Sequence, residues 1–238
     1  MPSPPEADFD ALYRGEVSLM EGLDGVPWDI GGPQPVLVDV VEAGGFSGAV
    51  LDVGCGQGEH AIFLASRGYR VTAVDNSAAG IEQARERAAA RGVEVEFALA
   101  DALTLSGYEN RFDTALDSIL YHCFETEEEQ RSYAAAVHRA LRPGGVLHLF
   151  AMSDKETNHI GPNPVSADNL RRTFAEGWRI RALTAEHYTS PVRADMLAAL
   201  RQKVAVLAGL DLPPAGPVEL GEDGMVLMPV WHLVAERR

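Results

Sequence analysis

Residues 51–77 read LDVGCGQGEHAIFLASRGYRVTAVDNS, and this stretch decides the class of fold. It begins with a short apolar run, continues through the glycines 54, 56 and 58 into a run of helix-forming residues, and ends in a second apolar run that closes at Asp75. Glycine permits positive φ angles and a close approach of a ligand to the backbone, and the first turn of a helix offers free N–H groups. The pattern predicts a strand–loop–helix–strand unit whose loop binds a ligand.

The same alternation of strand and helix continues on both sides of this unit. We expect helices at 58–68, after the cap residue Ser77, and after the capping box TEEE at 126–129. Strands that alternate with helices indicate a parallel sheet with right-handed crossovers, which binds ligands beyond the carboxyl ends of its strands. The expected strands are 49–53, 69–75, 93–100, 111–120 and 145–152.

The remaining third of the chain is less regular. We expect helices at 166–176 and 192–210 and strands at 178–189 and 225–236, joined by loops at 153–165 and 212–224. Pro229 argues for an edge or bulge position of the last strand, because proline cannot donate a hydrogen bond to a neighbouring strand. Nothing in the sequence marks a domain boundary, so we expect one domain over residues 1–238.

Composition and charge narrow the class of partner. The 238 residues carry 35 acids against 20 bases, a formal charge of −15, which opposes binding to nucleic acid or to anionic membranes. The two cysteines form no disulfide framework and have no metal-ligand spacing with any histidine, so we expect reduced thiols and no metal. Without a signal peptide or a membrane-spanning run, the sequence is typical of a cytoplasmic protein.

The glycine loop and two carboxylates outline the ligand. The loop reads G-x-G-x-G, and Glu59 stands where a dinucleotide-binding loop has its third glycine, a poor neighbour for a diphosphate. Asp75 lies at the end of the next strand, where a carboxylate accepts hydrogen bonds from both hydroxyls of a ribose. Asp101 follows the third strand and is placed to accept from an exocyclic amine such as that of adenine, although an ordinary solvated loop acid is the alternative. The three elements outline an adenosine-like ligand without a phosphate at the loop.

Five ordered motifs resemble those of the class I S-adenosylmethionine-dependent methyltransferases. They are VLDVGCGQG (50–58), AVDNS (73–77), ADA (100–102), FDTALDS (112–118) and LRPGG (141–145). The resemblance implies a Rossmann-like α/β fold, doubly wound, with a mostly parallel seven-stranded sheet and an antiparallel last strand. It also implies S-adenosylmethionine as cofactor and S-adenosylhomocysteine as product. The implied cofactor-binding residues are Asp52, Gly54, Cys55, Gly56, Gly58, Asp75, Asn76, Asp101, Ala102 and Ser118.

The segment PWDIGGPQP (27–35) resembles the N-terminal lid of small-molecule methyltransferases, namely the thiol and thiopurine enzymes and the mycobacterial heterocyclic toxin methyltransferases. This resemblance implies that Trp28 covers the cofactor or lines the acceptor pocket; a core aromatic that anchors the segment is an equal alternative. The expected layout is a helical lid at 1–45, a cofactor-binding core at 46–152, and an acceptor-side segment with the final strands at 153–238.

His122 is the residue we consider first for catalysis. It follows the fourth strand, beside the expected position of the acceptor, where a histidine can take a proton from a hydroxyl, thiol or ring nitrogen. A packing or capping role is its alternative, and an acceptor that is already ionised needs no base. His159, in the loop expected at 153–165, is within reach of the pocket as a further candidate, and Tyr13 and Tyr121 are weaker candidates. The histidines at 60, 138, 148, 187 and 232 need no special role.

The sequence therefore predicts a methyltransferase that transfers a methyl group to O, N or S of a small aromatic or heterocyclic acceptor. Methyl transfer from a sulfonium is an in-line displacement, for which alignment of donor and acceptor supplies about 7–11 kcal/mol of the barrier. A nicotinamide-dependent oxidoreductase, a cofactor-binding regulator without turnover, and a methyltransferase that acts on protein are the alternatives. The acceptor, the attacking atom and the oligomeric state stay open.

Overall fold

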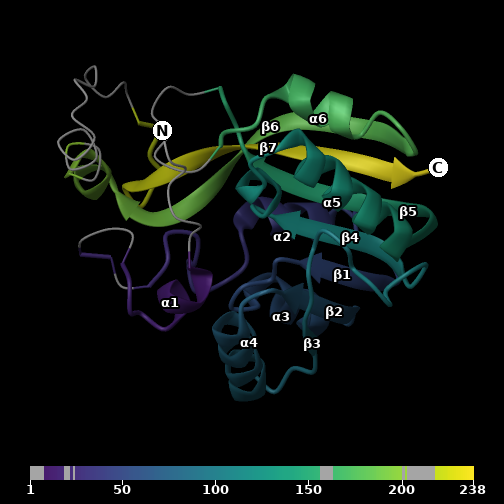
Figure 1. Cartoon of the computed structure of the whole chain (residues 1–238). Coiled ribbons are helices and arrows are strands. Elements are labelled where there is room, and N and C mark those ends of the chain that lie inside the picture. The colour runs from purple at the N-terminus through teal and green to yellow at the C-terminus, as the bar shows by residue number, and fades with distance from the viewer. Residues whose placement is uncertain (1–7, 19–21, 24, 156–162, 200–201, 203–217) are drawn as a thin grey trace.

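A computed structural model describes residues 8–18, 22–23, 25–155, 163–199, 202 and 218–238. Its centre is a seven-stranded sheet in the order β3-β2-β1-β4-β5-β7-β6 (Figure 1). Neighbouring strands are parallel from β3 to β5, and β7 is antiparallel to both β5 and β6. The strands are β1 (Ala49–Val53), β2 (Arg70–Asp75), β3 (Glu96–Leu99), β4 (Phe112–Ser118), β5 (Leu141–Met152), β6 (Trp178–Arg193) and β7 (Met225–Arg237). The predicted sheet, including its antiparallel last strand, is confirmed.

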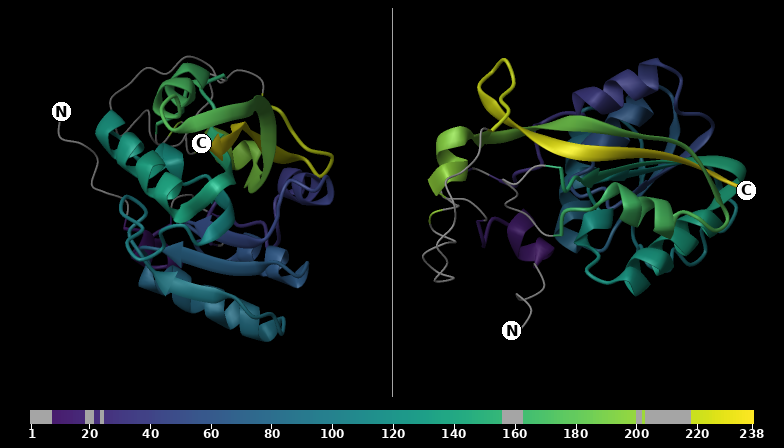
Figure 2. Two further views of the ribbon diagram at one scale, coloured as in Figure 1. Left: turned by 90° about the vertical axis from the view of Figure 1, so that its right-hand side faces the viewer. Right: turned by 90° about the horizontal axis from the view of Figure 1, so that it is seen from above.

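Helices cover both faces of this sheet (Figure 2). The helices are α1 (Phe9–Tyr13), α2 (Pro35–Glu42), α3 (Glu59–Ser66), α4 (Ala78–Ala90), η1 (Tyr121–Cys123), α5 (Glu127–Ala140) and α6 (Ala167–Thr173), and residues 194–199 are also helical. One apolar core joins α5 and α6 to the sheet through Tyr133, Val137 and Phe174. The other joins α2, α3 and α4 to the opposite face, with Leu64 and Ile81 fully buried. The result is the three-layer architecture expected for alternating strands and helices.

Local signals in the sequence explain where the elements begin. All five residues of β1 are buried, as expected for the central strand of a sheet with helices on both faces. The Ser77 hydroxyl accepts a hydrogen bond from the Gly80 N–H and caps α4, as predicted. The predicted capping box of Thr126 and Glu129 is also present at the start of α5.

Two boundaries differ from the sequence-based expectation. Strand β5 begins at Leu141 rather than at the predicted residue 145, because Leu141 is already extended and fully buried, paired with Phe112 of β4, and helix α5 therefore ends at Ala140. Strand β6 runs on to Arg193, so the start of the helix expected at 192–210 is extended. Most of the rest of that segment, residues 200–201 and 203–210, and His159 lie outside the described residues.

The prediction of an edge position for the last strand is wrong, because β7 lies between β5 and β6. Pro229 nevertheless occupies a place that tolerates proline. The ladder between β5 and β7 ends at Met152 and Val230, and the Pro229 carbonyl accepts a hydrogen bond from the Ser153 N–H just beyond it. The N–H that proline lacks would face the same side, past the end of the ladder, so no central hydrogen bond is lost.

Candidate functional site

The glycine loop follows β1 and adopts a conformation that only glycine takes easily. Gly54, Gly56 and Gly58 have φ angles of +72°, +51° and +81°. The Gly54 and Cys55 N–H groups both donate to the Val74 carbonyl, at 2.8 and 3.0 Å, which turns the loop toward the end of β2. Space is restricted as well as conformation, because a Cβ at Gly56 would lie 2.6 Å from the Tyr13 hydroxyl. The loop is thus closely packed against Tyr13, and a side chain at Gly56 would displace this contact.

Asp75 at the end of β2 organises this loop. One carboxylate oxygen accepts from the Gly56 N–H at 2.7 Å, and the other accepts from the Ser77 N–H at 2.8 Å. Burial raises the pKa of Asp75, and these backbone hydrogen bonds oppose the rise. Because each carboxylate oxygen has two lone pairs, the group can hold the loop and still accept from the hydroxyls of a ligand.

Asp101 lies next to Asp75 in space, as the spacing predicted. Strand β3 pairs Leu99 with Asp75, and the Ala100 N–H donates to the Asp75 carbonyl at 3.0 Å. Asp101 is exposed and accepts from the Leu103 N–H at 2.9 Å, while Ala102 is half-buried. Asn76 is exposed beside them. Sequence reasoning missed the exposed Leu99 side chain, 59% accessible, an apolar surface at the same strand end.

Asp52 is a buried acceptor that lacks a partner. The residue is 1% exposed, and its Oδ2 atom has no hydrogen-bond partner within the described structure. Burial raises its pKa to about 8, and the nearby Asp117 and Asp75 carboxylates contribute to the rise. A buried polar atom without a partner is costly, so this atom invites a donor from a ligand or from water.

The turn after β4 is fixed by a second buried carboxylate. Asp117 accepts from the Tyr133 hydroxyl at 2.6 Å and from the Leu120 N–H at 2.8 Å. Burial raises its pKa to about 7, against the effect of these hydrogen bonds. The turn holds Ile119 at a φ of +62°, a strained conformation for a β-branched residue and one that is frequent at functional sites. Leu120 then packs against Gly54, which places this turn beside the glycine loop.

His122 lies in η1, immediately after this turn. Its ring is 7% exposed, its Nδ1 atom has no partner within the described structure, and burial lowers its pKa to about 4. The neighbouring Tyr121 is anchored through its hydroxyl, which lies 3.2, 2.9 and 3.0 Å from oxygens of Gln130, Asn169 and Thr173. The structure thus holds His122 just after the end of β4, where the sequence predicted it, with burial keeping the imidazole neutral at pH 7, and the Tyr121 hydroxyl is engaged in packing contacts.

The N-terminal segment closes over the glycine loop. Asp10 of α1 accepts hydrogen bonds from the Ser77 hydroxyl and the Ala79 N–H, which lock α1 onto the start of α4. Trp28 is half-buried and meets the Tyr13 ring edge-on, with the ring centroids 6.4 Å apart, and Phe9 packs on its other side at 6.1 Å. Burial raises the pKa of Tyr13 above its usual range, so this phenol stays protonated beside Asp75.

Two contacts between distant segments lie on the side of β6, and no local sequence pattern indicated either of them. The Ser118 hydroxyl at the end of β4 lies 2.9 Å from the hydroxyl of the fully buried Tyr188. The Gln34 side chain, 1% exposed, donates to the Thr189 carbonyl and accepts from the Thr189 N–H, both at 2.9 Å. These contacts tie the segment before α2 to β6 and β6 to the end of β4.

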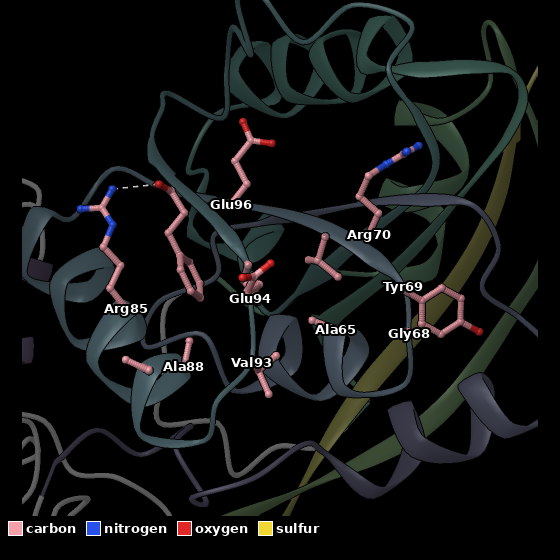
Figure 3. A pocket seen from close by; sticks show the side chains of 13 residues that line it. Ala65, Gly68, Tyr69, Arg70, Arg85, Ala88, Val93, Glu94 and Glu96 are labelled. Atoms are coloured by element: carbon pink, nitrogen blue, oxygen red, sulfur yellow. Dashed lines mark hydrogen bonds between the residues drawn. The ribbon is translucent and has the colours of Figure 1, made fainter.

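An open groove of about 810 Å³ lies elsewhere on the molecule and carries no chemistry related to this site (Figure 3). Its wall includes Arg70 and Val71 at the start of β2, whereas Asp75 ends that strand. Arg85 closes one side by donating to the Phe97 carbonyl at 2.8 Å. Within the described parts of the chain, no group of three or more His, Cys, Asp and Glu side chains is arranged to hold a metal ion.

One argument made from the sequence is corrected by the structure. Glu59 does not present a free carboxylate to the loop, because Arg87 and Arg91 of α4 both bond to it. Its negative charge therefore gives no electrostatic reason to reject a diphosphate.

Within the described residues, no helix is long and apolar enough to cross a membrane.

Comparison with known proteins settles the class. Residues 50–145 match the family model described as "Methyltransferase domain". A 2-heptyl-1-hydroxyquinolin-4(1H)-one methyltransferase of Mycobacteroides abscessus is 36% identical over 175 residues, which cover 72% of this chain and 76% of that protein. The chain belongs to the class I S-adenosylmethionine-dependent methyltransferases, and its methyl donor is S-adenosylmethionine.

Other relatives differ in how far the similarity extends. The solved structure from work on the conversion of a disulfide bond into a thioacetal group during echinomycin biosynthesis is 38% identical, with a TM-score of 0.75 and coverage of 96% of this chain and 91% of that one. A tRNA 5-carboxymethoxyuridine methyltransferase of Escherichia coli is 38% identical, but over 42% of this chain and 39% of that protein. A Methanosarcina mazei methyltransferase structure, 17% identical with a TM-score of 0.59, covers 87% of this chain and 98% of that one and supports the fold alone.

Proposed function

We propose that this methyltransferase acts on O, N or S of a small aromatic or heterocyclic acceptor. The observation that carries this proposal is the similarity to the quinolone methyltransferase, which extends over 72% of the chain, beyond the motifs shared by all members of the fold. The aromatic side chains of Phe9, Tyr13 and Trp28, packed over the glycine loop, support it, since a covered site suits a small acceptor better than a macromolecule.

The residues present fit the cofactor. Bound S-adenosylmethionine supplies a methyl group already activated by its sulfonium. In our proposal the loop of Gly54, Cys55, Gly56 and Gly58 holds the methionine part, and the unpartnered Asp52 oxygen receives a donor there. Asp75 accepts from the ribose hydroxyls, with Asn76 alongside. Asp101 takes the adenine amine, Ala102 flanks the ring, Ser118 closes the site at the end of β4, and Trp28 covers it.

His122 is our proposed general base. Its low pKa, about 4, leaves the imidazole unprotonated at neutral pH, with a free nitrogen to accept a proton. The same low pKa makes it a weak base, so it suits acceptors whose own proton is fairly acidic, such as an N-hydroxyl or a phenol. Replacement by Asn would slow methylation of such acceptors by about 10²–10⁴-fold. An acceptor that is fully ionised in solution should be affected far less.

A panel assay tests the proposal. S-adenosylhomocysteine release is measured with hydroxyquinolones, phenols, thiols, halide and N-heterocycles, using wild type and His122→Asn. We expect turnover confined to one class of acceptor. Tight binding of the cofactor without turnover of any panel member would refute the small acceptor and favour a protein substrate or a regulator without turnover.

A further inference from the structure

Glu59, the first residue of α3, has an unusual environment for a position at the cofactor loop. Its side chain is 9% exposed, and the carboxylate accepts from Arg87 at 2.8 Å and from the two terminal nitrogens of Arg91 at 2.6 and 2.8 Å. Arg87 lies in the last turn of α4, and Arg91, four residues later, is the C-cap residue of that helix. The start of α3 is thus tied to the last part of α4 by two guanidinium groups.

Arg87 makes a further contact that Arg91 does not. Its second terminal nitrogen donates to Asp29 Oδ2 at 2.7 Å, in the segment before α2. In the orientation of its amide that donates to Asp29 and accepts from Arg87, at 2.9 and 3.0 Å, Gln57 of the glycine loop joins this contact in place of the hydrogen bond that it otherwise donates to Gln83 Oε1. A single guanidinium therefore contacts the start of α3, the glycine loop and the segment that precedes α2.

This segment, described at residues 25–34, covers the loop, and we call it the cover segment. Asp29 directly follows Trp28, whose ring packs on Tyr13, which in turn lies against Gly56. A hydrogen bond from the Gly31 N–H to Asp29 Oδ1, 2.8 Å long, makes the turn after Trp28 rigid. At its far end the cover segment is fixed by Gln34 on Thr189. Asp29 and Gln34 are thus two of the residues whose side chains attach this segment to the rest of the protein.

The contact of Arg87 with Asp29 is screened less than a surface ion pair. The two side chains are 28% and 18% exposed, and both groups accept or donate additional hydrogen bonds. Removal of Arg87 leaves the partly buried Asp29 carboxylate without its ionic partner, whereas removal of the Asp29 charge leaves Arg87 paired with Glu59.

We propose that Arg87 is a positioning residue, whose contact with Asp29 holds the cover segment closed over the glycine loop and so retards release of the cofactor. The inference rests on the proposed placement of S-adenosylmethionine in that loop. The third glycine of a dinucleotide loop is replaced here by an acid that anchors the arginine.

Three single variants and one double variant separate this role from a merely structural one. Asp29→Asn removes the charge that Arg87 contacts but keeps an oxygen for the Gly31 N–H, and it leaves both arginines on Glu59. Arg87→Gln removes the contact from the other side. Arg91→Gln is the matched control, because it takes one guanidinium from Glu59 without touching Asp29. Stopped-flow dissociation and calorimetric affinity are measured with S-adenosylhomocysteine, together with the melting temperature.

We expect Asp29→Asn and Arg87→Gln each to speed dissociation and weaken affinity about tenfold, which corresponds to about 1.4 kcal/mol. The double variant, Asp29→Asn with Arg87→Gln, should bind no more weakly than Arg87→Gln alone, because both changes break the same contact, and Arg91→Gln should stay within twofold of wild type. Unchanged dissociation from Asp29→Asn, or equal losses in Arg87→Gln and Arg91→Gln, would overturn the positioning role while leaving the cofactor site intact. A wild-type protein that fails to bind S-adenosylhomocysteine would overturn the proposed placement of the cofactor as well.

Discussion

The glycine loop and the end of β4 lie side by side at the carboxyl edge of the sheet, yet contacts of very different range hold them. On the cofactor side, Asp75 bonds to Ser77 and Gly56, two and nineteen residues away in sequence. On the side of β6, where we propose that the acceptor lies, Ser118 meets Tyr188 across 70 residues, and Gln34 of the cover segment meets Thr189 across 155. The glycine loop itself is therefore organised by a short stretch of chain, whereas its cover and the end of β4 depend on contacts between segments far apart in sequence, such as Asp10 with Ser77 and Arg87 with Asp29. This difference suits a family with one cofactor and many acceptors.

Substitution of Asp75 should have the largest effect, because this carboxylate organises the glycine loop. In Asp75→Asn only one side-chain oxygen is left, so the amide nitrogen must face either the Gly56 or the Ser77 N–H, and a ribose contact weakens too. We expect S-adenosylhomocysteine to bind about 100-fold more weakly, since hydrogen bonds to charged groups contribute about 1.5–3 kcal/mol. Calorimetry measures the affinity, and the melting temperature serves as a control for folding. Affinity within threefold of wild type would contradict the role of Asp75.

Gln34→Leu tests the longest-range contact on the acceptor side. It leaves the Thr189 N–H and C=O without their side-chain partners in a buried place. Unfolding free energy, measured by urea denaturation, should fall by about 2–4 kcal/mol, because each unsatisfied buried group costs about 1–3 kcal/mol. A loss below about 1 kcal/mol would show that the attachment of the cover segment to β6 is dispensable for folding.

A buried imidazole pair between β5 and β7 gives the stability of the protein a pH dependence of its own. His148 Nε2 faces the Gly45 carbonyl at 2.9 Å and therefore carries a proton, which leaves its Nδ1 atom to accept from His232 Nε2 at 3.1 Å. Burial lowers the pKa of both rings, that of His232 to about 3 with a contribution from His148. The unfolded chain takes up a proton near pH 6.5 that the folded chain refuses, so stability falls as the pH drops from 6.5 toward 3.

The raised pKa values of Asp52 and Asp117 act in the opposite direction, since the folded protein holds protons there up to about pH 8 and 7. A difference measurement isolates the imidazole contribution. Between pH 7 and pH 5, wild type should lose about 2 kcal/mol of unfolding free energy relative to His232→Asn. Parallel stability curves for the two proteins would mean that His232 does not resist protonation.

Tyr188→Phe should have the smallest effect, and it tests whether the β6 side contributes to acceptor binding separately from cofactor binding. It removes only the hydrogen bond to the half-buried Ser118 hydroxyl, about 1 kcal/mol. We expect the KM of the acceptor to rise about threefold to tenfold, with S-adenosylhomocysteine affinity within twofold of wild type. Steady-state kinetics with an acceptor found in the panel provides the test. A larger change in S-adenosylhomocysteine affinity than in the KM of the acceptor would contradict the placement of Tyr188 on the acceptor side.

The same difference in range explains what could be predicted from the sequence. The strands of the core, the cap at Ser77, the capping box at Thr126 and the glycine loop all depend on neighbours close in sequence, and the structure has each of them. Three contacts depend instead on which segments become adjacent in the fold, and no local sequence pattern predicts this adjacency. They are Gln34–Thr189, Ser118–Tyr188 and His148–His232. Glu59 shows the limit most clearly: its residue type is plain in the sequence, but its neutralisation by α4 arginines is not.

Amide hydrogen exchange of the wild-type protein, with and without S-adenosylhomocysteine, tests the central claim most directly. We expect added protection in residues 52–58, 75–80 and 99–105 and in the cover segment, with little change in β6 from 178 to 193. Protection concentrated in β6 and β7, with the glycine loop unchanged, would contradict the assignment of the two sides.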